Sequence, residues 1–280
     1  CQYSTTDFFF KRRNERKMNE NSIFLRMIED KYEHFIDYYT IMSSDFLSME
    51  QQSLAAGFLR KHEKEGVFLF GGFEDAERRQ VLFLPDYTGV TCEEDILPYF
   101  RKNPQDCPLA LLDIKTARAD RGKFSHRDYL GALMGEGIKR EKIGDILVSE
   151  DGAQVVVIRE LAEYLEQNYR HVGRSEVNAK VVPIFEAKET EKRINSVKFT
   201  ISSSRLDNII SAVYGLSRKT AVEAISAGKV FVGGAMVTKP DAGLKGGEKI
   251  VLRGKGKAIY NGVEGTSKKG KVYISVDKYL

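Results

Sequence analysis

The sequence has no tryptophan, only six prolines and only three cysteines among its 280 residues. The cysteines, Cys1, Cys92 and Cys107, are too few and too widely spaced for a cysteine zinc site, and their odd number argues against a disulfide framework. The four histidines show no metal-ligand spacing, so we expect neither a metal nor a cofactor. No apolar run is long enough to span a bilayer and no signal peptide is evident, which indicates a cytoplasmic protein without a membrane partner.

Motifs for catalysis are equally scarce. Neither a Walker A nor a GxGxxG nucleotide fingerprint is present. The triplet His126-Arg127-Asp128 mimics a kinase catalytic loop, but the phosphate-covering loop and the DFG aspartate are missing. Arg205-Leu206-Asp207 resembles the catalytic triplet of pseudouridine synthases, yet the next residues continue a helical pattern. We therefore expect a non-enzyme. The alternative is an RNA-modifying enzyme of the pseudouridine synthase or methyltransferase type that uses Asp113 or Asp128.

Positive charge is concentrated at the C-terminal end of the chain. Residues 195–280 contain fifteen Lys and Arg against six Asp and Glu, a net charge of +9, whereas the whole chain is only +4. The preceding residues therefore have a net charge of −5. Such asymmetry between regions is typical of a nucleic-acid-binding module attached to an ordinary globular protein.

Residues 198–260 show the clearest local pattern. Apolar residues at helical spacing predict a short helix from about Leu206, with Ser204 and Asp207 at its start as cap and dipole partner and Gly215 at its end. Ser217 begins a second helix that Gly228 ends. A hairpin follows around Gly233-Gly234, and then a further strand over Lys249–Leu252.

Basic side chains stand where these elements begin. Helix N-termini favour phosphate through their free N–H groups and their dipole, so we expect an RNA-binding edge there. A basic segment alternating with glycine, predicted to be a flexible loop, could close over the RNA backbone. The predicted RNA-binding residues are Arg205, Arg218, Lys219, Lys229, Arg253, Lys255 and Lys257. The tail 267–271 adds a further contact or is only a turn, and the alternation of apolar residues after it favours the turn.

Several short motifs in this stretch keep both order and spacing: Ser204-Arg205-Leu206-Asp207, Leu216-Ser217-Arg218-Lys219, Ala227-Gly228-Lys229-Val230 and Val232-Gly233-Gly234. On these motifs, residues 195–280 resemble the S4 RNA-binding domain. Gly233 departs from the pattern, since the family usually has asparagine there. Both residues tolerate positive φ, so the turn is kept while a side-chain contact to RNA is lost. The resemblance implies binding to structured RNA.

The N-terminal quarter of the sequence is expected to be helical. Residues 1–17 begin without methionine and precede Met18, so we interpret them as an extension that is not native to the protein. The alternative is a basic arm. Residues 18–65 form a helical region whose apolar face is marked by Phe24, Met27, Ile28, Phe35 and Ile36, and Ser48 with Gln51 predicts a capping box.

Residues 66–185 interleave strand and helix patterns. The strand candidates are Val67–Phe70, Val81–Leu84, Leu109–Ile114, Ile146–Val148, Val155–Ile158 and Val181–Ile184. We predict an RRM-like or ferredoxin-like open sheet with helices on one face, which makes the whole protein α+β. Asp151-Gly152 predicts a tight hairpin, and the charged residues 186–194 predict a linker.

A weaker basic cluster lies within this region. Its members, secondary RNA-binding candidates, are His126, Arg127, Lys139 and Arg140. A solvated helix face explains the lysine and arginines as well as RNA contact does, and His126 could instead cap a helix. Arg78 and Arg79 either extend the basic surface or pair with Glu74 and Glu77; we expect pairing for one of them.

Two longer stretches, Gly71 to Tyr87 and His126 to Ile146, resemble the bacterial YlmH family, whose members have a C-terminal S4 domain and are encoded among cell-division genes. With the S4 motifs, the resemblance extends from about Asp45 to the end of the chain. It implies binding to ribosomal RNA and association with the large ribosomal subunit, with tRNA as a further RNA. It also implies ribosome-associated quality control and a link to cell-division proteins. A cell-division scaffold remains the alternative from another functional class.

Overall fold

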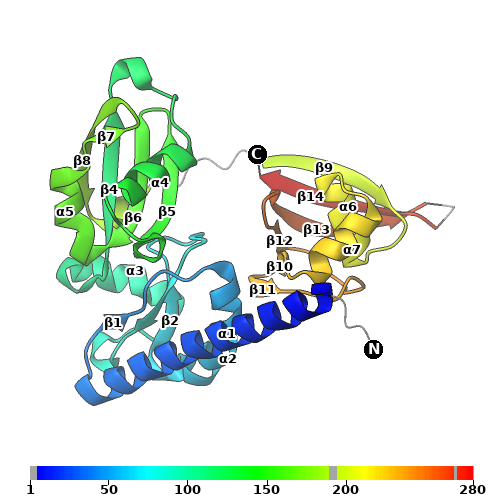
Figure 1. The fold of residues 1–280 in the computed structure, drawn as a ribbon, viewed down its shortest axis with the longest axis horizontal. Helices are drawn as coiled ribbons and strands as arrows, with labels where there is room; N and C mark the ends of the chain where they lie inside the picture. The colour runs from blue at the N-terminus through cyan, green and yellow to red at the C-terminus, as the bar shows by residue number, and fades with distance from the viewer. Residues whose placement is uncertain (1–4, 189–193, 268–269, 280) are drawn as a thin grey trace. The chain divides into compact units, whose positions relative to one another are not determined.

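The computed structural model describes residues 5–188, 194–267 and 270–279, which form two compact units, 5–188 and 194–279 (Figure 1). Most of the predicted linker 186–194 and the first four residues of the predicted extension lie outside the described residues. The rest of that extension is the first part of a helix. None of the helices in the described part of the chain has both the length and the apolar character needed to cross a membrane.

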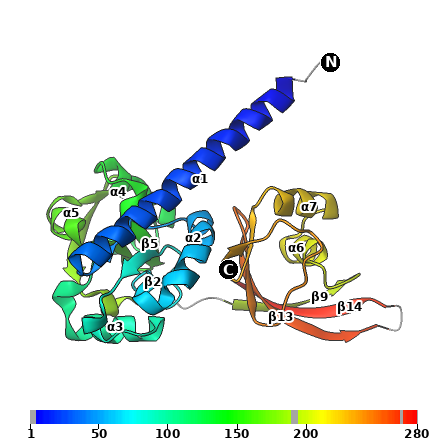
Figure 2. The same ribbon diagram turned by 90° about the horizontal axis from the view of Figure 1, so that it is seen from below.

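The N-terminal unit begins with two helices beside a small antiparallel sheet (Figure 2). In chain order these elements are α1 (Thr5–Tyr38), β1 (Met42–Ser43), α2 (Met49–His62), β2 (Val67–Phe70) and β3 (Gln80–Phe83). The strand order is β1-β3-β2. The helices bury one apolar cluster against this sheet, so it has a core of its own.

Local sequence explains where these two helices begin and end. The chain leaves α1 at Tyr39, which has a positive φ of 51°. The predicted capping box of α2 is present, because Ser48 and Gln51 each accept a hydrogen bond from the other's backbone N–H. Phe24, Ile28 and Phe35 are buried as predicted, whereas Met27 and Ile36 of the predicted apolar face are 42% and 51% exposed.

The second part of the N-terminal unit is a five-stranded antiparallel sheet with the order β5-β6-β4-β8-β7. Helices α4 and α5 cover one face of this sheet, and α3 lies in the apolar cluster of the other. The elements are α3 (Glu93–Lys102), β4 (Leu109–Thr116), α4 (His126–Gly135), β5 (Ile143–Ser149), β6 (Gly152–Ile158), α5 (Ala162–Asn168), β7 (His171–Val172) and β8 (Ser175–Val182). The predicted hairpin joins β5 to β6 and pairs Ser149 with Gly152.

The prediction of one open sheet across residues 66–185 is wrong in two respects. Strands β2 and β3 belong to a separate sheet, in which β3 pairs with both β1 and β2, and not to the five-stranded sheet. The face opposite α4 and α5 is also covered, since Leu109, Leu111 and Val156 pack against side chains of α3 and of the small sheet. The physical reason is that β4 and β6 have apolar residues at consecutive positions, so both of their faces need burial.

The C-terminal unit is a six-stranded antiparallel sheet with two helices on one face (Figures 1 and 2). The strand order is β11-β10-β12-β13-β14-β9. The elements are β9 (Ile194–Ile201), α6 (Leu206–Tyr214), α7 (Arg218–Ser226), β10 (Val230–Val232), β11 (Ala235–Met236), β12 (Glu248–Leu252), β13 (Gly256–Thr266) and β14 (Val272–Tyr279). The apolar faces of α6 and α7 pack on this sheet as the sequence pattern predicts.

Capping and turn residues of this unit match their predictions except at one point. Gly215 ends α6 with a φ of 64°, and the side chain of Ser217 caps α7 by accepting the N–H of Thr220 at 3.1 Å. Gly233 and Gly234, with φ of 56° and 82°, form the turn between β10 and β11. The exception is Ser204, because the residue at the N-cap of α6 is Arg205, without a side-chain cap.

Candidate nucleic-acid interface

Two of the predicted arginines share one buried carboxylate. Asp207, in the first turn of α6, has a side chain that is only 1% exposed. Nε of Arg205 lies 3.2 Å from Oδ1 of Asp207, and Nε of Arg218 lies 3.0 Å from Oδ2. Burial raises the pKa of Asp207, but hydrogen bonds from Arg218 and Arg205 outweigh burial and hold this pKa below its usual value. The ionised carboxylate therefore holds together the cations of α6 and α7. We call this group the Asp207 arginine pair.

The Asp207 arginine pair remains open to solvent. The side chains of Arg205 and Arg218 are 45% and 60% exposed. Arg218 donates to Asp207 through Nε, and no described residue accepts a hydrogen bond from its two terminal nitrogens. A guanidinium has five donors in a planar fork that matches phosphate. The terminal nitrogens of Arg218 are therefore oriented and available for an anionic ligand.

The two helix N-termini differ from the prediction that both offer free N–H groups. At α6, the amide of Leu206 donates to the carbonyl of Ala242 and that of Asp207 donates to the carbonyl of Pro240, both at 2.9 Å. These amides are therefore already used within the protein, because the loop before β12 covers the start of α6. At α7, the amide of Thr220 is capped by Ser217. The amides of Arg218 and Lys219, just before Thr220, donate to no described residue. Of these two helix ends, the start of α7 is therefore the one left for phosphate.

A second basic group lies where β10 begins and β12 ends. The amide of Arg253 donates to the carbonyl of Lys229 at 2.9 Å, which brings the backbones of the two residues together. The predicted flexible loop is instead a short hairpin turn, since Lys255 donates to the carbonyl of Leu252 and β13 starts directly after it. Lys257 lies in β13 with Nζ 5.0 Å from the ring centre of Tyr279.

The seven predicted residues are therefore arranged in two groups on the C-terminal unit. Besides Arg205 and Arg218, which form the Asp207 arginine pair, four of the seven are exposed. The remaining residue, Lys257, is half-buried. The exposed four are Lys219, Lys229, Arg253 and Lys255. Asp207 lies in the first turn of α6, as expected of a dipole partner, but its further role as the buried partner of two arginines was not predicted from the sequence. The sequence contains a signal for this pairing. An aspartate next to apolar helix positions is buried only when its charge is paired, and two arginines are near it in the sequence.

In the N-terminal unit, Arg140 is tied to the backbone. Its Nη1 donates to the carbonyls of Ile143 at 2.5 Å and Gly144 at 3.2 Å. Arg78 beside it donates from Nε to the carbonyl of Ile143 at 2.9 Å and from Nη2 to Phe46 at 3.1 Å. Burial and the neighbouring Arg78 cation lower the pKa of Arg140 to about 10. These contacts give both arginines a structural role.

The remaining secondary candidates lie on or beside α4. His126 does not cap this helix; the cap is Ser125, which forms a capping box with Asp128. Partial desolvation of the His126 ring, together with the Arg140 cation, lowers the pKa of His126. Arg127 and Lys139 are exposed. Of this predicted cluster, only Arg127 and Lys139 offer charge to solvent at neutral pH.

The two aspartates of the enzyme alternative have structural partners. Asp128 accepts the N–H and the hydroxyl of Ser125, both at 2.7 Å, and these bonds lower its pKa. Asp113 lies 3.5 Å from Nζ of Lys115 on the same strand. Among the described residues, no three His, Cys, Asp or Glu side chains are grouped so that they could hold a metal ion. Neither aspartate is thus placed as an acid or base with a perturbing partner in a cleft.

Comparison with known families gives two matches along the chain. Residues 103–186 match a family described as "Putative RNA-binding domain in YlmH". This range covers the five-stranded sheet of the N-terminal unit. Residues 204–250 match the S4 domain, from the start of α6 into β12. The Asp207 arginine pair therefore belongs to the S4 domain, as the sequence motifs implied.

Two individual proteins are also similar to this chain. One is the "Ribosome-associated protein quality control protein P2" of Bacillus subtilis, which is 26% identical over 245 residues, covering 86% of this chain and 89% of the relative. The other is the solved structure of the "Cell division protein ylmH from Streptococcus pneumoniae", at 22% identity and a TM-score of 0.45, covering 61% of this chain and 95% of that one.

Proposed function

The chain belongs to the YlmH family, and from this premise we propose that it docks on structured ribosomal RNA of the large subunit through its S4 domain. Double-stranded RNA is recognised mainly through its shape, its phosphates and its 2′-OH groups, so sequence specificity should be low. Transfer RNA, which is also folded, is a second RNA that the same surface could contact.

The observation that supports this proposal most is the Asp207 arginine pair. One buried carboxylate fixes two exposed guanidinium groups of separate helices at 3.2 and 3.0 Å. An arginine held in place loses less conformational entropy when it meets a phosphate than a mobile surface cation does. Lys219 extends this charge along α7. The group of Lys229, Arg253 and Lys255 adds a further cationic area on the same unit.

The biological setting proposed here is ribosome-associated quality control in the cytoplasm, without a catalytic step. It is supported by the name of the Bacillus subtilis relative, whose match spans most of both chains. The contribution of residues 103–186 is proposed to be RRM-like, since β4-α4-β5-β6-α5-β8 is a βαββαβ succession, with the two-residue strand β7 inserted between α5 and β8. Its sheet is covered on both faces, however, so its RNA contacts would come from exposed side chains such as Arg127 and Lys139.

Sedimentation of cell lysates through sucrose gradients tests the proposal. We expect the wild-type protein to migrate with the large subunit at low salt and to be released at moderate salt. If about five phosphates are neutralised, the log–log salt slope of RNA binding is roughly −3.5 to −4.5. The test variant replaces Arg205, Arg218 and Lys219 by alanine, and it should leave the large subunit at low salt.

A matched control replaces three exposed cations of α1 and α2, Arg26, Arg60 and Lys61, which lie outside both matched domains, by alanine. The control changes the net charge by the same amount as the test variant does, so general electrostatics is held constant. The proposal fails if wild type stays at the top of the gradient in every condition, or if the control is released as readily as the test variant.

A further inference from the structure

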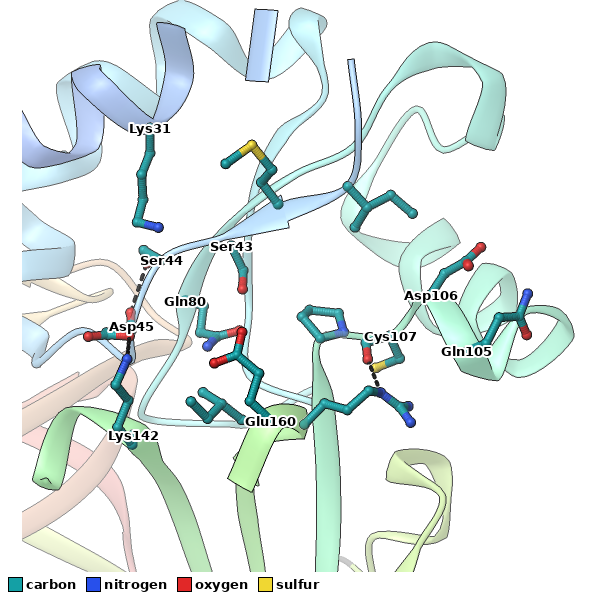
Figure 3. A pocket seen from close by; sticks show the side chains of 15 residues that line it. Lys31, Ser43, Ser44, Asp45, Gln80, Gln105, Asp106, Cys107, Lys142 and Glu160 are labelled. Atoms are coloured by element: carbon teal, nitrogen blue, oxygen red, sulfur yellow. Dashed lines mark hydrogen bonds and ion pairs between the residues drawn. The ribbon is translucent and has the colours of Figure 1, made fainter. Parts of the chain in front are cut away.

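A pocket in the N-terminal unit lies between the small sheet and the five-stranded sheet (Figure 3). Its volume is about 490 Å³, which falls in the range of small-molecule sites, roughly 300–1,000 Å³. Its walls come from α1, β1, β3, the segment before β4, and the end of β6. The pocket therefore joins the part of the chain matched by the YlmH domain to the helical part before it.

Gln80 makes this pocket unusual. The residue is 1% exposed, and neither Nε2 nor Oε1 of its side chain has a hydrogen-bond partner among the described residues. Its neighbours on β3 are apolar and pack in the cores on either side. Buried polar side chains almost always have partners, because an unpaired amide pays the full penalty of desolvation. An apolar residue of similar length would avoid this cost, so the amide needs an explanation.

The other polar side chains of the pocket fall into two kinds. Some have partners: Nζ of Lys142 lies 2.6 Å from Asp45, and Arg159 donates to the carbonyls of Cys107 and Pro104. Lys31 and Glu160, in contrast, make no hydrogen bond or ion pair with any residue that the structure describes. In Figure 3 the side chains of Gln80 and Glu160 extend into the pocket from opposite sides, and Lys31 reaches down from α1. The pocket is thus lined by an amide, a carboxylate and an ammonium group without described partners, and the amide, whose two polar atoms are covered in this conformation, reaches a ligand by rotation of its side chain.

We propose that this pocket binds a ribonucleotide, with the side-chain amide of Gln80 pairing to the edge of the base. A carboxamide presents a donor and an acceptor side by side, which matches the paired donor and acceptor of a nucleobase edge. A trans peptide group does not match it, because its N–H and C=O point in opposite directions. Lys31 supplies a cation for the phosphate. Glu160 accepts from an exocyclic amine or from a ribose hydroxyl.

The pocket goes beyond the RNA contacts proposed for the S4 domain, since it belongs to the other compact unit. The nucleotide has two possible sources with the same chemistry. One source is a free mononucleotide. The other source is a single nucleotide extruded from a bound RNA. Only this second source rests on the proposed function. The experiment below separates them.

The test uses the full chain and titrates AMP, GMP, CMP and UMP by isothermal titration calorimetry, and then a short single-stranded RNA of mixed sequence. The main variant is Gln80→Met, with Glu160→Gln as a second variant. Gln167→Met is the matched control, because Gln167 is an exposed glutamine of α5 that does not line the pocket. Thermal unfolding of each variant is measured beside binding.

The expected result is saturable binding of at least one mononucleotide, weakened about tenfold to a hundredfold by Gln80→Met and unchanged by the control. The thermal midpoint of Gln80→Met should equal or exceed that of wild type, because the substitution removes an unpaired buried amide. Loss of binding together with gained stability separates a ligand role from misfolding. The Glu160→Gln variant should change which base binds most tightly.

Other outcomes have defined meanings. In one outcome only the RNA binds, and Gln80→Met weakens RNA binding by the same factor in the wild-type and in the Arg218→Ala background. This result means that the pocket takes an extruded nucleotide. If neither mononucleotides nor RNA respond to Gln80→Met, the amide is satisfied by buried water and the proposal is overturned. Failure here leaves the S4 surface untouched, since the ribosome experiment uses residues of the other unit.

Discussion

Two arginine pairs, one in each unit, show what sequence charge alone does not distinguish. Arg205 and Arg218 share the carboxylate of Asp207, and their side chains remain 45% and 60% exposed. Arg78 and Arg140 share a backbone acceptor, the carbonyl of Ile143, and are half-buried. Burial lowers the pKa of both Arg78 and Arg140.

The comparison indicates that the group that accepts hydrogen bonds from an arginine side chain decides the role of that arginine. Backbone carbonyls that need donors hold Arg78 and Arg140 inside the fold, where their loss would leave several acceptors unsatisfied. A carboxylate that holds Nε of Arg218 leaves its terminal nitrogens for a ligand. Arg78 and Arg140 therefore stabilise the fold, whereas Arg205 and Arg218 are the pair that we propose to bind RNA. Four experiments can break or sharpen this distinction.

The largest effect is expected from Arg78→Ala. The variant removes donors from the carbonyls of Phe46, Arg140 and Ile143. We expect the free energy of unfolding of the N-terminal unit to fall by about 3 kcal/mol, because hydrogen bonds from charged groups are lost and buried acceptors stay unpaired. Urea unfolding measures this change. RNA affinity per folded molecule should not change.

Arg127→Ala is the control for Arg78→Ala, since Arg127 is exposed on α4 and should cost less than about 0.5 kcal/mol. Equal destabilisation by the two variants would contradict the assignment of Arg78 to the fold.

The next effect is on RNA affinity. We expect Arg218→Ala to weaken binding to every structured RNA by about tenfold and to flatten the log–log salt slope by about one unit, because one phosphate contact is lost. Fluorescence anisotropy with two unrelated RNA hairpins, measured over a series of salt concentrations, gives both quantities. Lys64→Ala, at an exposed lysine outside both matched domains, serves as control. An unchanged slope would remove Arg218 from the interface.

How much of this could be predicted from the sequence depends on the range of the interactions involved. The Ser48 capping box, the Gly215 helix end and the Gly233-Gly234 turn are local, and each was predicted because a few adjacent residues determine it. Strand β1 has only two residues, too short for any alternation to reveal it. The small sheet was therefore missed, and with it the covering of the second face of the larger sheet.

The geometry of the Asp207 arginine pair was not predicted from the sequence. The motifs indicated Arg205 and Arg218, yet the burial of Asp207 depends on the loop around Pro240 and Ala242, whose carbonyls accept hydrogen bonds from the amides at the start of α6. That contact joins residues more than thirty positions apart. Helix periodicity has no information about it, so the free helix end predicted at α6 was wrong. The unpaired side-chain amide of Gln80 also depends on contacts between residues distant in the sequence, so the sequence pattern did not predict it.

A smaller effect is expected on stability in acid. The pKa of Asp207 is lowered in the folded state, so its ion pairs add stability above the unfolded-state value of about 3.9 and lose it as pH falls through the folded value. Asp207→Asn should therefore be less stable than wild type near neutral pH by about 1 kcal/mol, a figure reduced because both arginines are exposed. Urea unfolding at neutral pH and near pH 2 measures the difference. The two curves should converge in acid, and a gap that persists there would show that packing, not charge, is responsible.

The smallest effect has the most informative sign. Asp207→Asn raises the net charge of the S4 domain by one, so charge alone predicts tighter RNA binding. If the carboxylate positions the arginines, the same variant should bind about threefold more weakly despite its added charge.

Fluorescence anisotropy at neutral pH, where both proteins are folded, decides between tighter and weaker RNA binding. Asp241→Asn is the matched control, because Asp241 is an exposed aspartate of the same unit and its neutralisation should strengthen binding slightly. If both substitutions strengthen binding equally, the Asp207 arginine pair acts only through its charge, and the difference between the two arginine pairs is then one of burial and not of positioning.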